Sequence, residues 1–353
     1  MKSIYTQLPD YLENEINVSL ATVVSTDGSA PQIPGSSAIY CSGVTVHGTI
    51  GGGSVEADTG KLSNDPGACS DIYTFNLANR ISEKEKPVCG GLISILLDVN
   101  PNDSSEVFRK IRDSLKSQSG GVLATLINQK GKKRIKRFWI TGAEVEQLPE
   151  QIRKAAGGII TGILSGIDVA RCHMIELSDT ENLFLEPVSP SPMLVIAGAG
   201  HIGRSLAHIA SYAGFEVTVI DDRPEFANRM NIPDATRILT GNIGTVLRET
   251  SLSGDSYIVI VTRGHKDDAE ALRECIGKDV QYIGMIGSRS KTSAMKQEFL
   301  KNGWANEEQW SGIYTPVGLD INSRTVEEIA ISIVAELIMV KNSRKGKRSS
   351  CPA

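Results

Sequence analysis

A glycine-rich turn in the second half of the chain has the residue types and the spacing of a phosphate-binding site. The segment Gly198-Ala199-Gly200-His201-Ile202-Gly203 follows an apolar stretch, residues 193–197, and opens an amphipathic stretch, residues 202–213. The first glycine permits a tight turn, the second lets a pyrophosphate approach the backbone, and the third lets a helix pack on the strand. The start of that helix offers unpaired N–H groups to phosphate. The sequence therefore predicts a phosphate site formed by Gly198, Gly200, His201, Ile202 and Gly203.

An acidic residue at the end of the next expected strand favours NAD as the ligand of this turn. Asp221 stands where a carboxylate accepts hydrogen bonds from the adenine-ribose hydroxyls and disfavours a 2′-phosphate. Arg223 counters that preference, so the sequence favours NAD over NADP only weakly. The alternative is a Rossmann-like fold that has lost its ligand.

Polar loops follow two later apolar stretches, and ligands of open α/β sheets bind at such loops. Thr262–Asp268 follows residues 257–261, and Gly284–Arg289 follows residues 281–283. In the first loop, His265 is a candidate general acid or base. The candidate binders of an anionic group in the two loops are Arg263, Gly287, Ser288 and Arg289.

The same two loops also have a purely structural interpretation. Asp267 or Asp268 would cap the helix after the first loop, and Ser288 would cap the helix that carries Lys291. The sequence leaves both interpretations open.

The first half of the chain carries a second glycine loop, Gly51-Gly52-Gly53, followed by Glu56. Consecutive glycines allow positive φ angles and close approach of a ligand, and the helix expected after them offers N–H groups. This suits a phosphate or pterin-like ligand, but it also suits a tight structural turn. Cys89, which precedes two glycines, is a candidate thiolate ligand for a soft metal; a buried structural cysteine is the alternative.

Composition excludes several classes of protein. The 353 residues carry a net charge of −4, which leaves no footprint for nucleic acid. The six cysteines form no C-x-x-C pair, so neither a disulfide framework nor a zinc finger is expected. The first residues lack a signal-peptide pattern, and the longest apolar run, Ile329–Val340, is interrupted by Glu336 and is too short to span a bilayer. The sequence predicts a cytoplasmic protein without a membrane segment.

Three prolines within residues 186–192 predict a stiff connector between two domains. The grouped strands before the connector predict a smaller α+β domain over residues 1–188. Its expected elements are a helix at 10–18, strands at 18–24 and 92–99, a helix at 105–117, and hairpins that pair 37–40 with 44–46 and 121–128 with 135–140.

After the connector, short apolar strands alternate with helices. Strands are expected at 193–197, 216–220, 236–239, 257–261 and 281–283, and helices at 202–213, 243–249, 267–275, 291–301 and 325–340. This alternation predicts an α/β fold over residues 192–342, a Rossmann-type parallel sheet with helices on both faces. The basic tail, residues 343–353, is expected to be disordered.

Taken together, these motifs resemble those of one family, the xanthine dehydrogenase accessory factors, also called XdhC/CoxI proteins. The resemblance covers almost the whole chain. Its most specific part is the combination of the triple glycine and Glu56 with two later segments, Tyr282–Arg289 and Pro316–Ile321.

The resemblance implies a maturation factor for molybdenum enzymes rather than a turnover enzyme. Such a protein binds the molybdenum cofactor transiently and protects it while a cysteine desulfurase exchanges a terminal oxygen for sulfur. It then delivers the cofactor to xanthine dehydrogenase or a related molybdenum hydroxylase. The resemblance also implies a homodimer.

One residue departs from the family pattern. Family members often have a cysteine after the triple glycine, where this chain has Ser54, and a hydroxyl is a far poorer ligand for molybdenum than a thiolate. Cys89 is then the only motif cysteine left for that role. With the loop 51–56 and the Rossmann turn, it is expected to line one cleft between the domains, with Arg263 or Arg289 beside the cofactor phosphate.

Two other functions stay open. An NAD(H)-dependent oxidoreductase would use the Rossmann turn together with His265 as acid or base. A ligand-sensing scaffold would use a nucleotide only to regulate the docking of a partner.

Overall fold

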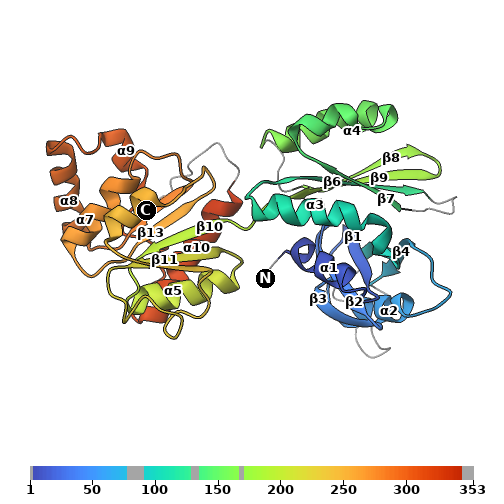
Figure 1. The fold of residues 1–353 in the computed structure, drawn as a ribbon, viewed down its shortest axis with the longest axis horizontal. Coiled ribbons are helices and arrows are strands. Elements are labelled where there is room, and N and C mark those ends of the chain that lie inside the picture. Colours follow the sequence, from blue (N-terminus) through green and yellow to red (C-terminus); the bar gives the residue numbers. More distant parts are fainter. Residues whose placement is uncertain (1–2, 78–90, 129–134, 167–170, 344–353) are drawn as a thin grey trace. The chain divides into compact units, whose positions relative to one another are not determined.

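The computed structural model describes residues 3–77, 91–128, 135–166 and 171–343. The chain divides into two compact units, residues 2–190 and 191–353 (Figure 1). The N-terminal unit is the longer of the two, and not the smaller one that the sequence predicts, because it contains two sheets.

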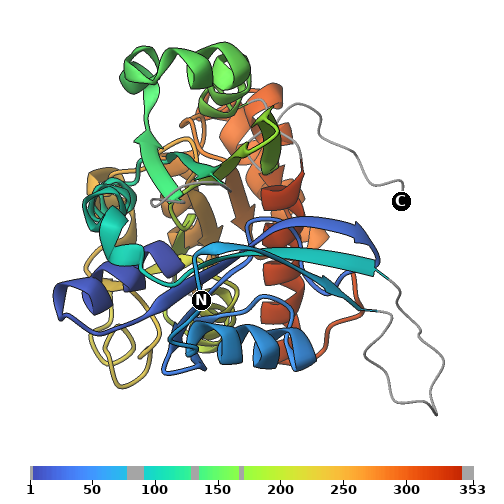
Figure 2. The same ribbon diagram turned by 90° about the vertical axis from the view of Figure 1, so that its right-hand side faces the viewer.

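The first sheet of the N-terminal unit is antiparallel, in the strand order β3-β2-β1-β5-β4. One of its faces packs against α1 (Ile4–Glu13) and α3 (Ser105–Lys116), and the other packs against α2 (Gly53–Ser63), which Figure 2 shows beside the strands. Alternating side chains produce this division, since Leu20 faces α1 and α3 while Ala21 belongs to the opposite cluster. The strands are β1 (Ser19–Gly28), β2 (Ser37–Cys41), β3 (Val44–Gly48), β4 (Asp71–Asn76) and β5 (Gly91–Asp98).

The first helix lies earlier in the chain than its predicted range, residues 10–18. It begins at Ile4 and ends at Glu13, because Tyr5, Leu8 and Leu12 form the apolar stripe that packs on the sheet. The chain then turns into β1 through Glu15, whose φ of 56° ends helical geometry.

The second sheet of this unit is also antiparallel, in the order β7-β6-β9-β8, and α4 (Glu150–Leu164) packs on one face. Its strands are β6 (Gly121–Asn128), β7 (Ile135–Ile140), β8 (His173–Ser178) and β9 (Glu181–Val188), with 3₁₀ turns at Pro101–Ser104 and Gly142–Gln147. The predicted hairpins β2–β3 and β6–β7 are both confirmed.

Two buried polar contacts link elements of the N-terminal unit. The guanidinium of Arg137, on β7, lies 2.5 Å from the carboxylate of Asp98 at the end of β5, so an ion pair joins the two sheets. The hydroxyl of Tyr5, on α1, donates a hydrogen bond to Glu186 on β9.

The C-terminal unit is built on a six-stranded parallel sheet in the order β12-β11-β10-β13-β14-β15. The predicted Rossmann-type sheet is thereby confirmed. The order in which strands are added to the sheet reverses between β10 and β13. Open α/β sheets bind their ligands at the carboxyl edge beside such a reversal. The strands are β10 (Met193–Ala197), β11 (Glu216–Asp221), β12 (Arg237–Thr240), β13 (Tyr257–Ile260), β14 (Tyr282–Met285) and β15 (Ile313–Tyr314).

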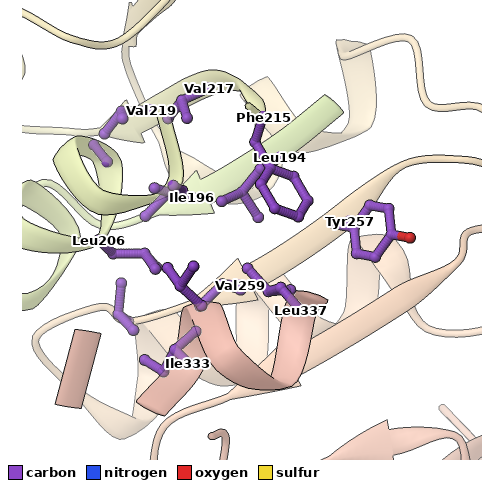
Figure 3. Packing of buried hydrophobic residues seen from close by; sticks show 14 of the residues in the cluster. Leu194, Ile196, Leu206, Phe215, Val217, Val219, Tyr257, Val259, Ile333 and Leu337 are labelled. Carbon is purple, nitrogen blue, oxygen red and sulfur yellow. The ribbon is translucent and has the colours of Figure 1, made fainter. Parts of the chain in front are cut away.

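Helices cover both faces of this sheet. Leu194 and Ile196 of β10 pack with α5 (His201–Tyr212) and α10 (Val326–Asn342), as Figure 3 shows, whereas Val195 and Ala197 belong to the cluster on the other face. That second face is covered by α6 (Ile243–Glu249), α7 (His265–Cys275), α8 (Arg289–Lys301) and α9 (Glu307–Ser311). In the described ranges no helix has the length and apolar character needed to cross a bilayer. The predicted disordered tail lies outside the described residues, except for its first residue, Ser343.

Candidate functional site

The turn after β10 requires glycine at its first position. Gly198 has a φ of +118°, and a Cβ atom on it would lie 2.5 Å from the carbonyl oxygen of Val261. Its N–H donates to the carbonyl of Ile220 at 2.8 Å. The turn is therefore fixed against the two neighbouring strands, β11 and β13.

The other two glycines of the turn have different roles. A Cβ on Gly203 would lie 1.9 Å from the carbonyl oxygen of Gly198, so only glycine lets the helix pack this close to the turn. Gly200 is the N-cap of α5, has an ordinary φ of −67°, and faces open space. In the described structure, the backbone N–H groups of the first turn of α5 receive no hydrogen-bond acceptor from a capping side chain, and that turn has no acidic residue. Helix N-termini with this geometry can accept a phosphate, and whether this one does stays a prediction.

The two remaining predicted residues of this turn follow Gly200 on α5. His201 is exposed, and Ile202 is half-buried against the core between α5 and the sheet. Ile202 packs the start of α5 against the core, and the His201 side chain lies at the surface beside the turn. The hydrogen-bond donors of the turn are backbone N–H groups.

Asp221 is committed to contacts within the chain. Its Oδ2 accepts a hydrogen bond from the N–H of Ala199 at 2.7 Å, and the Arg223 guanidinium binds both carboxylate oxygens at 2.8 and 2.9 Å. Burial alone would raise the pKa of Asp221, but the hydrogen bonds from Arg223 and Ala199 outweigh it and lower that pKa. The residue is 1% exposed, so a ribose diol would have to displace Arg223 to reach it. Whether Asp221 binds a ribose and favours NAD stays a prediction.

Arg223 is itself held from both sides. Its guanidinium stacks over the ring of Phe226 at 4.0 Å while it binds Asp221. The neighbouring Asp222 lies 3.8 Å from the Arg223 guanidinium and accepts a hydrogen bond from Arg263 of the β13 loop at 2.9 Å. Arginines on two adjacent loops thus balance the acidic end of β11.

The loop after β13 uses its polar residues differently from the sequence prediction. Its helix, α7, has Gly264 at the N-cap and no side-chain cap, so the prediction that Asp267 or Asp268 caps it is wrong. Asp267 pairs with Arg263 at 3.4 Å. The side chain of His265 is 44% exposed, with its Nε2 3.3 Å from Glu298 on α8. This position gives His265 no buried partner that would orient it as an acid or base.

The loop after β14 agrees better with its structural interpretation. Ser288 is the N-cap of α8, and its hydroxyl accepts a hydrogen bond from the N–H of Lys291 at 3.3 Å, which confirms the predicted cap. Arg289 is exposed as the first residue of that helix, and Gly287 is half-buried in the loop. Whether these residues bind an anion stays a prediction.

The glycine loop of the N-terminal unit has a backbone that other residues rarely adopt. Gly51, Gly52 and Gly53 all have positive φ, and Gly52, with φ 69° and ψ −174°, lies in a region that is essentially restricted to glycine. Gly51 packs against Pro31, but a Cβ on Gly52 or Gly53 would meet open space. Glycine adopts this backbone without strain and other residues would not, so the loop just before α2 depends on glycine.

Glu56 holds this loop in shape. Its Oε1 accepts hydrogen bonds from the hydroxyl of Thr49 at 2.6 Å and from the N–H of Ile50 at 3.0 Å. The Thr49 hydroxyl in turn lies 3.2 Å from the N–H of Gly51. Ser54, two residues before Glu56, is exposed in the first turn of α2.

No metal centre is formed by the described residues. Cys89 lies outside them, and within them no three His, Cys, Asp or Glu side chains lie close enough together to hold an ion. Burial and the charge of Glu186 raise the pKa of Cys172 to about 12, and burial raises that of Cys275 to about 12. Those two thiols are therefore poor thiolate donors.

Sequence reasoning missed the role of Glu336, which fastens the loop after β15. Its Oε2 accepts hydrogen bonds from the hydroxyl of Tyr282 and from the N–H of Gly318, the latter at 2.9 Å. The hydroxyl of Ser332, one turn earlier on α10, donates to the carbonyl of Leu319 at 2.7 Å. The position of Glu336 within the apolar run Ile329–Val340 could have indicated this role, because a buried carboxylate needs a hydrogen-bond partner.

Sequence reasoning also missed the pairing of Asp268 with Lys291, which joins the loops after β13 and β14. The two residues are far apart in the sequence, and only the parallel pairing of β13 with β14 brings their loops together.

Comparison with known proteins agrees with this geometry. The model of the XdhC Rossmann domain matches residues 194–337, and that of the XdhC and CoxI family matches residues 12–62. A protein from Bacillus subtilis, named as a probable subunit of xanthine dehydrogenase, is 26% identical over 350 residues, which are 97% of this chain and 98% of that protein. The uncharacterized protein YqeB of Escherichia coli is 32% identical over 166 residues, which are 47% of this chain and 30% of that protein.

A solved structure has the same fold. The crystal structure of a xanthine dehydrogenase from Bacillus halodurans superposes with a TM-score of 0.76 at 25% identity, over 100% of this chain and 98% of that one. The two family models match both units and together span more than half of the 353 residues. The chain belongs to the XdhC/CoxI family of xanthine dehydrogenase accessory-type proteins.

Proposed function

We propose that this chain binds the molybdenum cofactor and assists its sulfuration and insertion into xanthine dehydrogenase or a related molybdenum hydroxylase. Membership of the XdhC/CoxI family supports this, as does the name of the Bacillus subtilis relative. The observation that carries the proposal is the open glycine turn of Gly198, Gly200 and Gly203, which offers backbone N–H groups to a phosphate.

The described residues fit the organic, phosphate-bearing part of such a cofactor. Gly200 faces open space at the start of α5, and Gly52 and Gly53 face open space at the start of α2. An anionic group can approach each of these stretches of backbone closely.

Each unit then has a defined task. In the C-terminal unit, the N–H groups after Gly200 bind the phosphate, while the bond from Ala199 to Asp221 keeps the turn in place. In the N-terminal unit, Glu56 fixes the conformation of the glycine loop, and the hydroxyl of Ser54 is exposed beside that loop. When bound, the cofactor supplies the molybdenum centre at which sulfuration takes place.

The partners follow from this task. A cysteine desulfurase supplies the sulfur, and the target molybdenum hydroxylase receives the cofactor. We also propose that the chain acts as a homodimer. Sedimentation velocity of the purified chain tests the dimer independently of the ligand.

Cofactor transfer is the decisive experiment. Molybdenum cofactor released anoxically from a donor enzyme is titrated into the full-length chain and followed by absorbance and calorimetry. The loaded chain is then mixed with cofactor-free xanthine dehydrogenase. We expect saturable binding and recovery of dehydrogenase activity, and a matched titration with the variant Gly200→Asp should show neither. Absence of binding to the wild-type chain would refute the proposal.

The competing function is an NAD(H)-dependent oxidoreductase. The Rossmann turn favours it, but the contacts of Asp221 with Arg223 and the exposed position of His265 weigh against it. A thermal-shift titration with NADH separates the two proposals. Tight binding of NADH, combined with maturation of xanthine dehydrogenase in cells that lack this chain, would favour the oxidoreductase.

A further inference from the structure

A buried carboxylate at the carboxyl edge of the Rossmann sheet holds a lysine ammonium in place. Asp268, in the first turn of α7, is 0% exposed. Its Oδ1 accepts a hydrogen bond from the hydroxyl of Thr262 at 2.5 Å, and its Oδ2 binds the ammonium of Lys291 on α8. The lysine side chain is 29% exposed, so Asp268 is fully buried while Lys291 is accessible to solvent.

Such a pair is a poor way to gain stability. Taking a carboxylate out of water costs several kcal/mol, and a buried ion pair often does no better than apolar side chains of the same volume. The Asp268 carboxylate has a neutral and a charged partner, which fixes its orientation and therefore that of the ammonium. Lys291 has three donors, and Asp268 takes one of them.

The position of the pair connects it to the glycine turn. A Cβ on Gly198 would lie 2.5 Å from the carbonyl oxygen of Val261 and 3.1 Å from the N–H of Thr262, so the turn touches the start of the β13 loop. Thr262 bonds Asp268, and Asp268 bonds Lys291. A series of contacts thus leads from the turn, where the strand order reverses between β10 and β13, to the ammonium beyond the carboxyl end of the neighbouring strand β14.

The surroundings of Lys291 favour a negative charge. The first turn of α8 holds no acidic residue but carries Arg289 and Lys291, although the positive end of a helix dipole disfavours cations. The stem of Lys291 lies against Gly287, where a Cβ would be 3.6 Å from its Cδ. Among the described cations of this edge, Arg263 is already paired with Asp222 and Asp267.

We propose that Lys291, oriented by Asp268 and Thr262, binds the phosphate of the ligand that occupies the turn at Gly198–Gly203. This rests on the phosphate-binding part of the proposed function. The chemistry is that of a phosphate ester or diphosphate, whether it belongs to a pterin cofactor or to a dinucleotide. The exposed His265, which the sequence favours, has no part in it.

Calorimetric titration of the full-length chain with inorganic pyrophosphate tests the proposal. We expect binding that weakens with salt, and Lys291→Met should lower the affinity at least tenfold. Lys296→Met is the matched control, because Lys296 lies on the same helix and pairs with the exposed Glu307. Its affinity should stay within twofold of the wild type. Equal binding by Lys291→Met, or no binding by the wild type at millimolar pyrophosphate, would overturn the proposal.

A second measurement needs no variant and therefore does not depend on folding of the mutant. Acetylation of the wild-type chain, read by mass spectrometry, should slow at Lys291 but not at Lys296 when pyrophosphate is present. Unchanged labelling of Lys291 by saturating pyrophosphate contradicts the proposal.

Titrations with NADH and with molybdenum cofactor identify the source of the phosphate. If the cofactor fails to bind while pyrophosphate binding depends on Lys291, the proposed function falls and this inference stands. If the cofactor binds wild type and Lys291→Met equally, the inference falls and the proposed function stands.

Discussion

The hydroxyl of Tyr5 donates a hydrogen bond to Glu186 Oε2 at 2.7 Å, although the two residues are 181 positions apart. Both are buried, and the contact holds the first helix of the chain to the last strand of the N-terminal unit. Burial raises the pKa of Glu186 to about 7, even though Tyr5 and the charge of Arg137 act to lower it. The Tyr5 hydroxyl, for its part, has a pKa raised well above its usual value by burial and by the nearby Glu186 carboxylate.

The stability of the N-terminal unit should therefore fall between pH 4.5 and 7. Over this range the unfolded chain ionises Glu186 while the folded chain keeps its proton, so the unfolding free energy decreases as the pH rises. The full effect is about 3 kcal/mol, at roughly 1.4 kcal/mol for each unit by which the pKa is raised. Urea unfolding at several pH values measures it. Glu186→Gln should flatten the profile and the exposed Glu176→Gln should not; a profile unchanged by Glu186→Gln would contradict the assignment.

Alanine at two positions of the glycine turn should affect different properties, stability at Gly203 and ligand binding at Gly200. Gly203→Ala places a Cβ 1.9 Å from the carbonyl oxygen of Gly198, and we expect it to destabilise the C-terminal unit by about 1–3 kcal/mol. Gly200→Ala meets open space at an ordinary φ and should fold like the wild type, yet it should weaken pyrophosphate binding by hindering its approach. Thermal denaturation and calorimetry measure the two effects. A stable Gly203→Ala would show that the turn is less rigid than its geometry indicates.

Removal of the Asp221 carboxylate should lower the unfolding free energy far more than removal of the Asp222 carboxylate. Asp221→Ala leaves Arg223 and the N–H of Ala199 without their shared acceptor, and we expect a loss of about 2–4 kcal/mol. Asp222→Ala removes an exposed pair with Arg263, which is worth about 0–1 kcal/mol. Urea unfolding compares them, and equal losses would argue against the buried network.

The backbone of the triple glycine can be tested inside its own unit. Gly52→Ala forces a side chain into a conformation that is essentially restricted to glycine, at a cost of about 1–3 kcal/mol. Gly158→Ala, in the middle of α4 with open space around it, should be neutral or stabilising by up to about 1 kcal/mol. If Gly52→Ala proves as stable as Gly158→Ala, this position does not require glycine.

Ser54→Cys should create a reactive thiol. Ser54 is exposed in the first turn of α2, and a helix N-terminus lowers the pKa of a cysteine thiol there. The rate of iodoacetamide labelling as a function of pH gives that pKa, with the exposed Cys69 as the internal reference. We also expect Ser54→Cys to retain molybdenum cofactor longer than the wild type. Equal retention would mean that this position does not contact the metal.

Local sequence patterns predicted the parts of the fold that depend on neighbouring residues. The Gly198–Gly203 turn and the cap at Ser288 were found because their spacing alone defines the geometry. β15, only two residues long, lacks any such pattern, and α9 is too short for a helical stripe to be visible. Strands β8 and β9 were not predicted, because the second sheet pairs strands that are distant in sequence, such as β6 with β9.

The roles of individual charged residues were harder to predict. Asp221 has the position of a ribose-binding carboxylate, but Arg223, two residues later, occupies it. Asp268 has the position of a helix cap, but Lys291 on the neighbouring helix α8 pairs with it. In both cases the competing partner is decided by side-chain direction in the folded chain, which spacing does not encode.

The contact between Glu336 and Gly318 affects how relatives of this protein can be recombined. A chimera that took the segment after β15 from one homologue and the last helix from another would fold well only if the carboxylate and the glycine N–H stayed matched. Gly318, at φ +96° and with Ser332 against it, tolerates no side chain. In such a chimera the Pro316–Ile321 motif and helix α10 should therefore be exchanged together, although 18 positions separate the two residues that join them.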